Sequence, residues 1–352
     1  MNTSSVITRK SSEDNKVPAQ ALAAGVPPGV LIDAQGVPVG EAQLLSAWSE
    51  AAFVPSHGTM PSGALPSTRG FVDLGAAAAL RVVGPDRESW LTGVTTADVK
   101  AAQAGGAVYS LFLNGRGRVV ADGYVFRFAD ELVITTRPDR LDALHTHLDK
   151  LLIMEDAELS RATGRHRLRW VGAPPDASLT EGVRGSPDAL GFEVLLTADR
   201  AAQVLAQVPE RADAGVLETL RIARGIPAWG QDFGEETTPL EAGLDRAIAF
   251  NKGCYVGQEV VAMATYRGRV QWNLVRLAME GEVPQVGAQL DPARGGKGKV
   301  TSAAQLGAQA IALGVVHREK MAPGSVVDLA DGRKATVLGL PYGSLPGAGV
   351  CA

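Results

Sequence analysis

The sequence is poor in cysteine and has no long apolar run, and these shortages exclude several classes of protein. Two cysteines, Cys254 and Cys351, occur far apart among 352 residues. A disulfide framework is thereby excluded, and a reducing cytoplasm is the expected location. No segment approaches the roughly 20 apolar residues that a membrane-spanning helix requires, so we expect no membrane contact. Residues 1–16 lack the apolar centre of a secretory signal, which argues against export.

An excess of charge of one sign is also lacking. The 34 basic and 38 acidic side chains give a formal net charge of -4, so no overall field would hold a nucleic acid, and none is expected as a direct partner. Of the five histidines, His145 and His147 face different directions on a predicted helix and the others are isolated, so no metal site is expected. The chain is 45% hydrophobic, and its length favours two or three packed units.

Proline and glycine punctuate the beginning of the chain at a density that breaks helices and central strands. We therefore expect a partly flexible N-terminal extension over residues 1–66. Within it, one short helix is predicted over residues 41–53, where Leu44, Trp48 and other apolar residues recur at helical spacing.

The pattern changes to strands and helices from Gly70 onward. Strands are predicted over residues 71–74, 79–83, 107–113, 119–128, 132–136, 168–171 and 192–196, and helices over residues 86–93, 200–208 and 214–223 with another that starts near residue 138. Asp86 is expected to cap the first of these helices. Asn114 and Gly115 are expected to form a hairpin turn, since both residue types tolerate a positive φ.

After Arg269 the helical pattern nearly vanishes. Alternating segments recur at residues 270–274, 308–317, 325–329 and 334–338. This pattern predicts a small all-β unit at the C-terminal end of the chain.

Residues 252–259 place a thiol between two glycines, in a loop that leads into a short helix from about residue 257. They read Lys252, Gly253, Cys254, Tyr255, Val256, Gly257, Gln258 and Glu259. A helix N-terminus and the ammonium of Lys252 both supply positive potential, which favours thiolate over thiol at Cys254. The alternative is a small buried residue that packs under a turn, but the glycine and polar neighbours argue for an exposed thiol.

Other polar residues in and after this segment have both a functional and a purely structural interpretation. Gln258 and Glu259 fall in the first helical turn, where a carboxylate complements the helix dipole, so Glu259 has a purely structural interpretation as well. Arg267 and Gly268 end the segment together with Arg269. Two arginines beside a glycine suit a carboxylate or phosphate, and a solvated turn is an equally ordinary interpretation.

Three charged residues stand in apolar surroundings. Asp122 lies inside the predicted strand 119–128, so its carboxylate is expected to leave the sheet toward a cleft, since a buried carboxylate is costly without partners. Glu193 stands in a comparable strand, and Arg221 lies on a predicted apolar helix. Structural salt bridges explain Glu193 and Arg221 as well as a binding role does.

Motifs spread over residues 69–338 resemble the superfamily of aminomethyltransferase, the T-protein of the glycine cleavage system, and its YgfZ-type relatives. They occupy residues 91–99, 113–117, 191–194, 220–227, 230–232, 238–244 and 252–259. The resemblance implies an α+β fold: a three-part ring of two α+β folate-binding units and a C-terminal antiparallel β-barrel. It also implies the division of the chain. The folate-binding region would span residues 67–267, the barrel residues 268–345, and a tail residues 346–352.

The resemblance further implies a ligand, tetrahydrofolate or a folate derivative, in the hole of the ring. Asp122 matches an acidic position beside the reactive nitrogens of folate, and Glu193 matches a carboxylate that contacts the pterin ring. Such a carboxylate can accept two hydrogen bonds from the pterin at once. Arg221 matches an arginine of the folate site.

Two functions compete within the superfamily. If the chain resembles the YgfZ type in function, it is a folate-dependent factor that supports iron-sulphur cluster assembly or repair in client enzymes, tRNA-modifying enzymes included. Aminomethyltransferases move a one-carbon unit from a lipoyl-bound intermediate to tetrahydrofolate. Cys254 and the following Gly257, Gln258 and Glu259 favour the YgfZ type, because true aminomethyltransferases resemble Lys-Gly-Asp-Phe-Ile-Gly here. Asp122 favours the transferase, because some YgfZ-type proteins lack an acid there.

A third interpretation is an inert folate-binding module, against which Cys254 argues by resemblance. The expected protein is a monomer that binds folate and contacts iron-sulphur client enzymes transiently. The sequence leaves open whether it catalyses a reaction.

Overall fold

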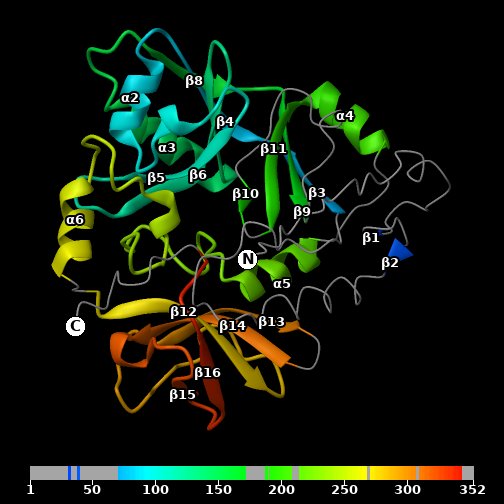
Figure 1. The fold of residues 1–352 in the computed structure, drawn as a ribbon, viewed down its shortest axis with the longest axis vertical. Coiled ribbons are helices and arrows are strands. Elements are labelled where there is room, and N and C mark those ends of the chain that lie inside the picture. Colours follow the sequence, from blue (N-terminus) through cyan, green and yellow to red (C-terminus); the bar gives the residue numbers. More distant parts are fainter. Residues whose placement is uncertain are drawn as a thin grey trace, which may run out of the picture.

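The chain folds as an α+β protein with several antiparallel sheets (Figure 1). The computed structural model describes residues 31–32, 38–39, 70–171, 187–188, 190–207, 214–267, 270–306 and 309–342. The helix predicted over residues 41–53 and the tail over residues 346–352 lie outside the described residues. Within the described part, no helix has the length and apolar character that crossing a bilayer requires.

The first large sheet has five antiparallel strands in the order β5-β6-β7-β4-β8. Its strands are β4 (Ala78–Val83), β5 (Ala107–Leu113), β6 (Val119–Arg127), β7 (Leu132–Thr136) and β8 (Glu158–Ala162). Helices α2 (Arg87–Val94) and α3 (Leu141–Asp149) cover one face through a core that includes Trp90, Leu91, Phe112, Ile134 and Leu148. The alternating runs form these strands because their apolar side chains meet the helices on this face.

The second sheet has four antiparallel strands in the order β10-β11-β9-β3. Its elements are β3 (Gly70–Ala76), β9 (Arg165–Val171), β10 (Pro187–Asp188), β11 (Gly191–Thr197) and the covering helix α4 (Ala198–Gln207). The chain passes from β3 to β4 through Ala77, so the two sheets are joined directly. A shared cluster contains Leu195 of β11 together with Phe126 and Val133 of the first sheet. The two sheets therefore bury apolar surface against each other.

The C-terminal sheet has five antiparallel strands in the order β13-β14-β12-β16-β15. The strands are β12 (Trp272–Glu280), β13 (Lys299–Leu306), β14 (Gln309–His317), β15 (Val326–Asp328) and β16 (Lys334–Gly339). Isolated bridges from Gln289 to Lys299 and from Leu290 to Leu329 link its two edges through one short segment. No described sheet is closed, so the α+β class is confirmed, whereas the ring and the closed barrel stay predictions.

The remaining elements connect these sheets. They are β1 (Leu31–Ile32), β2 (Pro38–Val39), η2 (Val99–Ala101), η3 (Pro138–Arg140), α5 (Ala214–Arg224), η4 (Asp245–Ala247), α6 (Gln258–Arg267) and η5 (Arg318–Lys320). Helix α5 lies between the upper sheets and the C-terminal sheet, where it packs on β13 and β14 (Figure 1). The segment from α5 to α6 is largely irregular and is held by a core that includes Trp229, Phe233, Leu244 and Tyr255.

Most predicted elements are confirmed, the hairpin at residues 114–117 included, but the predicted helix cap at Asp86 was wrong. Asp86 makes no side-chain cap on α2, and its carboxylate instead accepts a hydrogen bond from the Asp156 amide at 2.9 Å. The hairpin at residues 114–117 is present, yet its positive φ of 69° belongs to Gly117 rather than to Asn114 or Gly115. The Gly117 amide donates to the Asn114 carbonyl at 2.9 Å, which closes the turn one residue later than the Asn-Gly pattern predicts.

This hairpin packs closely against the loop that precedes α6. Gly257 has a φ of 82°, and a Cβ there would lie 2.8 Å from the Asn114 carbonyl oxygen and 3.3 Å from the Gly117 Cα. A Cβ at Gly117 would lie 2.7 Å from the Cβ of Val260. Two glycines therefore allow two backbones to meet at the loop that carries Cys254.

Gly257→Ala should lower the free energy of unfolding by about 1–3 kcal/mol, because the new side chain needs a strained φ and clashes with the hairpin. Urea unfolding of the purified variant measures this loss. Gly115→Ala is the matched control, since no atom lies within 4 Å of its added Cβ. An equal loss in both variants would contradict the close-packing explanation.

Candidate functional site

Cys254 is exposed in a short loop before α6. The loop is held on both sides: the Tyr255 amide donates to the Gln258 side-chain oxygen at 3.2 Å, and the Val256 amide donates to the Gly93 carbonyl at 3.2 Å. Tyr255 itself is buried in the core below. The predicted exposure of the thiol is therefore confirmed, and an ordered loop presents it.

Lys252 anchors this loop to the end of α2. Its ammonium donates to the backbone carbonyls of Thr92, Thr95 and Ala97, and it lies 4.8 Å from the ring centroid of Tyr255. Burial lowers the pKa of Lys252 to about 8. The ammonium thus binds carbonyls that helix α2 leaves free at its C-terminal end, which gives it a structural contact that the sequence did not indicate.

The other residues of segment 252–259 lie in the loop or in the first turn of α6. Gln258 and Glu259 begin α6, and Glu259 is exposed in its first turn. Gly253 is exposed beside the thiol. The Arg267 side chain and Gly268 lie outside the described residues, so their proposed role as an anion site stays a prediction.

Asp122 projects from β6 toward Tyr109 of β5. Its Oδ2 accepts a hydrogen bond from the Tyr109 hydroxyl at 2.7 Å, whereas its Oδ1 is buried and has no hydrogen-bond partner. Burial raises the pKa of Asp122, an effect that the Tyr109 hydrogen bond and the charges of Arg137 and Arg167 oppose. Burial and the nearby Asp122 charge also raise the pKa of Tyr109. A buried acceptor without a donor is costly, so this oxygen suits a ligand N–H.

Glu193 lies across the sheet boundary from Asp122. It is 2% exposed, accepts a hydrogen bond from Arg167, and lies 3.5 Å from the guanidinium of Arg169. The charge of Arg167 also acts on Asp122. The two carboxylates therefore share one arginine, and the structure brings them into one polar region where the first two sheets meet.

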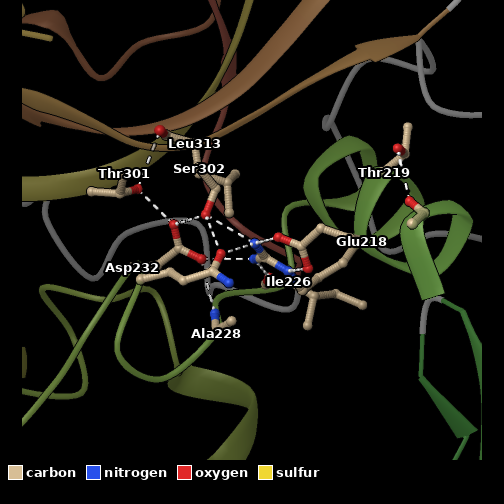
Figure 2. Close-up of polar contacts among 11 residues, drawn as sticks. Glu218, Thr219, Ile226, Ala228, Asp232, Thr301, Ser302 and Leu313 are labelled. Carbon is tan, nitrogen blue, oxygen red and sulfur yellow. Dashed lines mark hydrogen bonds and ion pairs between the residues drawn. The ribbon is translucent and has the colours of Figure 1, made fainter. Parts of the chain in front are cut away.

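Arg221 belongs to a different network, at the contact between α5 and β13. Its guanidinium donates to Asp232 at 2.7 Å, to Ser302 and Gln231 at 2.9 Å, to the Ile226 carbonyl, and to Glu218. Figure 2 shows Asp232, Ser302 and Glu218 converging on this network. Glu218, Gln231 and Ser302 also line a cavity of about 450 Å³. All three guanidinium nitrogens have protein partners, so a folate contact by Arg221 stays a prediction.

The sequence interpretation missed Tyr109, which contacts Asp122, and the neighbouring charged residues Asp245 and Arg246. The Arg246 guanidinium lies 4.8 Å from the ring centroid of Tyr109 and 5.6 Å from that of Tyr342. Its neighbour Asp245 is 3% exposed, with an Oδ1 that has no partner, and burial raises its pKa to about 6. Charged residues between two recognised motifs, at residues 245–246, were the only signal in the sequence.

Comparisons with known proteins match this fold. Residues 63–168 match the GCVT N-terminal domain family. A tRNA-modifying protein YgfZ from Photorhabdus laumondii is 27% identical over 293 residues, which cover 74% of this chain and 88% of that protein. An iron-sulfur cluster assembly factor IBA57 homolog from Pyricularia oryzae is 30% identical over 228 residues, covering 59% of this chain and 57% of that protein.

A solved structure, the glycine cleavage system aminomethyltransferase T from Bartonella henselae, aligns with a TM-score of 0.64 at 20% identity and covers 78% of this chain and 87% of that one. The family match and the YgfZ and IBA57 relatives support the resemblance of the chain to YgfZ-type proteins of the aminomethyltransferase superfamily. At this identity the solved structure supports the shared fold alone.

The chain combines an exposed cysteine with a separate polar region around Asp122 and Glu193. In the part of the chain that the structure describes, no three His, Cys, Asp or Glu side chains gather closely enough to hold a metal ion. The arrangement therefore offers one accessible nucleophile and one buried set of hydrogen-bond acceptors.

Asp245 predicts a specific pH dependence of the stability of this chain. Its folded-state pKa of about 6 exceeds the ordinary 3.8. Between these two pH values the carboxyl therefore keeps its proton in the folded state and has lost it in the unfolded state. Stability contributed by this group therefore falls as pH rises from about 4 to about 6, by up to about 3 kcal/mol.

Asp245→Asn should remove that part of the pH dependence, because the amide does not ionise. Urea unfolding of both proteins between pH 4.5 and 7.5 measures the difference, and the variant should gain stability relative to the parent as pH rises. Parallel profiles over this range would contradict the assignment.

Proposed function

We propose that the protein is a tetrahydrofolate-binding factor that supports iron-sulphur cluster assembly or repair in client enzymes, tRNA-modifying enzymes among them. The observation that carries this proposal is the exposed Cys254, which an ordered loop presents. The relatives named YgfZ and IBA57 point in the same direction. An accessible thiol can contact a partner protein or a cluster, whereas a buried one cannot.

The folate site is proposed around Asp122 and Glu193. The partnerless Oδ1 of Asp122 fits an N–H donor of the reduced pterin, and Glu193 has further lone pairs beyond those that face Arg167 and Arg169. Tetrahydrofolate, when bound, supplies reduced ring nitrogens that carry one-carbon units. The chain's own residues orient it: Tyr109 fixes the Asp122 carboxyl, and the two arginines fix Glu193.

The finer architecture is part of the same proposal. The region over residues 67–267 and the C-terminal unit over residues 268–345 would form a ring with a closed barrel, which the bridges at Gln289 and Leu290 support. We place the protein in the cytoplasm as a monomer that meets its clients transiently, in line with the absence of a disulfide framework in the sequence.

Asp122→Asn should weaken tetrahydrofolate binding about tenfold, because the amide replaces an acceptor with an N–H where the ligand donates. Titration calorimetry under reducing conditions measures the dissociation constant. Asp130→Asn is the matched control, since Asp130 is exposed in the turn that follows the same strand. Unchanged folate affinity in the Asp122 variant would remove that residue from the site.

Cys254→Ala should abolish the ability of the protein to restore iron-sulphur enzyme activity in a strain that lacks its own YgfZ-type factor. The residue is exposed, so the substitution should leave the unfolding midpoint nearly unchanged. Cys351→Ala, which removes the other cysteine, should restore activity fully. Full restoration by the Cys254 variant would reject the role of the thiol.

An aminomethyltransferase is the second candidate, and one observation favours it. Asp122 is a buried carboxyl with a raised pKa next to a tyrosine hydroxyl, which suits proton transfer at a folate nitrogen. Robust aminomethyl transfer from a lipoyl carrier protein to tetrahydrofolate by the purified protein would decide for this candidate.

A further inference from the structure

The hairpin over residues 114–117 adjoins the loop that carries Cys254. The Gly117 Cα would lie 3.3 Å from a Cβ at Gly257, and Gly257 follows Cys254 by three residues. Because consecutive Cα atoms are about 3.8 Å apart, the Cα atoms of Arg116 and Cys254 lie within about 20 Å of each other. Helix α6, which follows the loop, lies at the periphery of the fold (Figure 1). A partner protein that approaches the thiol therefore also meets the tip of the hairpin.

The tip of this hairpin is held by hydrogen bonds. The Arg116 amide donates to the Asn114 side-chain oxygen at 2.9 Å, and the Arg118 amide donates to the same oxygen at 3.1 Å. The Asn114 amide donates to the Arg118 carbonyl at 3.0 Å. A partner that binds Arg116 therefore does not have to order its backbone, which lowers the entropy cost of association.

The Arg116 side chain is exposed and has no counter-ion in the described structure. Its neighbour Arg118 forms an ion pair with Glu241, whereas Arg116 forms none with any acid that the structure describes. Glu259, an exposed acid close to the thiol, lies in the first turn of α6, where the helix N-terminus offsets its charge. Arg116 therefore supplies a positive charge that is free to act on a partner.

An exposed aromatic side chain precedes the thiol. Phe250, four residues before Cys254, is 44% exposed, although phenylalanine is ordinarily buried. Four residues span at most about 14 Å, so Phe250 also lies near the thiol. Aromatic residues and arginine are the types that protein interfaces favour. The thiol thus has both types nearby, one from its own loop and one from the hairpin.

These spacings suit a single docked protein. A stable interface covers about 800 Å² on each partner, which is a patch roughly 30 Å across. A partner of this size that reaches Cys254 extends far enough to contact Arg116 and Phe250. An iron-sulphur cluster is held by thiolates, whose negative charges a nearby guanidinium complements.

We propose that Arg116, Phe250 and Cys254 form a docking surface for an iron-sulphur client, in which Arg116 faces the negatively charged loop that holds the client's cluster. Phe250 packs on an apolar side chain beside that loop. The inference rests on the proposed function, because it names the contact surface around the same thiol. Arg116 and Phe250 then decide which proteins reach Cys254, and the thiol itself contacts the cluster or its loop.

The first experiment tests whether the charge of Arg116 reaches the thiol, and it needs no client. The Cys351→Ala chain, whose remaining cysteine is Cys254, is labelled at low ionic strength with neutral iodoacetamide and with an aromatic disulfide that carries two carboxylates. Arg116→Glu should lower the rate with the negative reagent about threefold relative to the neutral one, because the charge near the thiol reverses. Arg116→Lys should keep the parent ratio. An unchanged ratio in Arg116→Glu would overturn the inference.

The second experiment measures docking through the restored activity of an iron-sulphur enzyme in a strain that lacks its own YgfZ-type factor. At equal protein levels, Arg116→Glu and Phe250→Ser should each reduce restoration at least about tenfold, as loss of an interface hot spot does. Arg116→Lys should retain most of the activity, because the charge remains. Lys297→Glu and Val286→Ser are the matched controls, since both residues are exposed in the C-terminal unit, and both should act as the parent.

The possible failures separate the two proposals. Because Phe250 is partly buried, the unfolding midpoint of its variant is measured as well, and the exposed Arg116 carries the test if that midpoint falls. If Arg116→Glu and Phe250→Ser restore activity fully while Cys254→Ala does not, the docking surface is wrong and the proposed function stands. If the parent restores no activity, the proposed function is wrong, and the docking surface is rejected with it.

Discussion

The ion pair between Arg221 and Asp232 fixes the junction on which the rest of the structure depends. The guanidinium of Arg221 and the Asp232 carboxylate meet at 2.7 Å, and the fully buried carboxylate also accepts hydrogen bonds from Thr301, Ser302 and the Ala228 amide. Helix α5, the loop after it and β13 are thereby held together. Loss of one partner from such a pair leaves an uncompensated buried charge, at a cost of about 3–5 kcal/mol.

A second set of contacts makes the cysteine loop ordered and accessible at once. Lys252 binds three carbonyls at the end of α2, while Gly257 and Gly117 let the loop and the 114–117 hairpin meet backbone to backbone. The hairpin is also the connection between β5 and β6, the strands that carry Tyr109 and Asp122. The loop that carries the thiol therefore packs on the hairpin whose two strands carry Tyr109 and Asp122.

Much of the fold was predictable because apolar periodicity persists wherever a strand or helix covers a core. The sequence did not predict strands that form by pairing with a neighbouring strand and lack a clear apolar periodicity. Strand β13 contains two alanines and several polar residues, and β8 is polar, so neither shows a strong strand pattern, yet each pairs along its length with a neighbour. Asp86 fits a helix cap by residue type, but its carboxylate accepts a hydrogen bond from the Asp156 amide instead. Composition alone does not reveal such a competing partner.

For the candidate site, the sequence by itself indicated the segment around Cys254, because glycines, a lysine and a thiol at fixed spacing form a local signature. It also indicated the acids in the apolar strands. Only the tertiary structure decided how these residues are grouped. It joined Asp122 to Tyr109 and Glu193 to Arg167, committed Arg221 to Asp232, and brought Arg246 to the rings of Tyr109 and Tyr342. The physical reason is that hydrogen bonds, charge and burial depend on distance in space, and residues from separate elements come within that distance only after the sheets have packed.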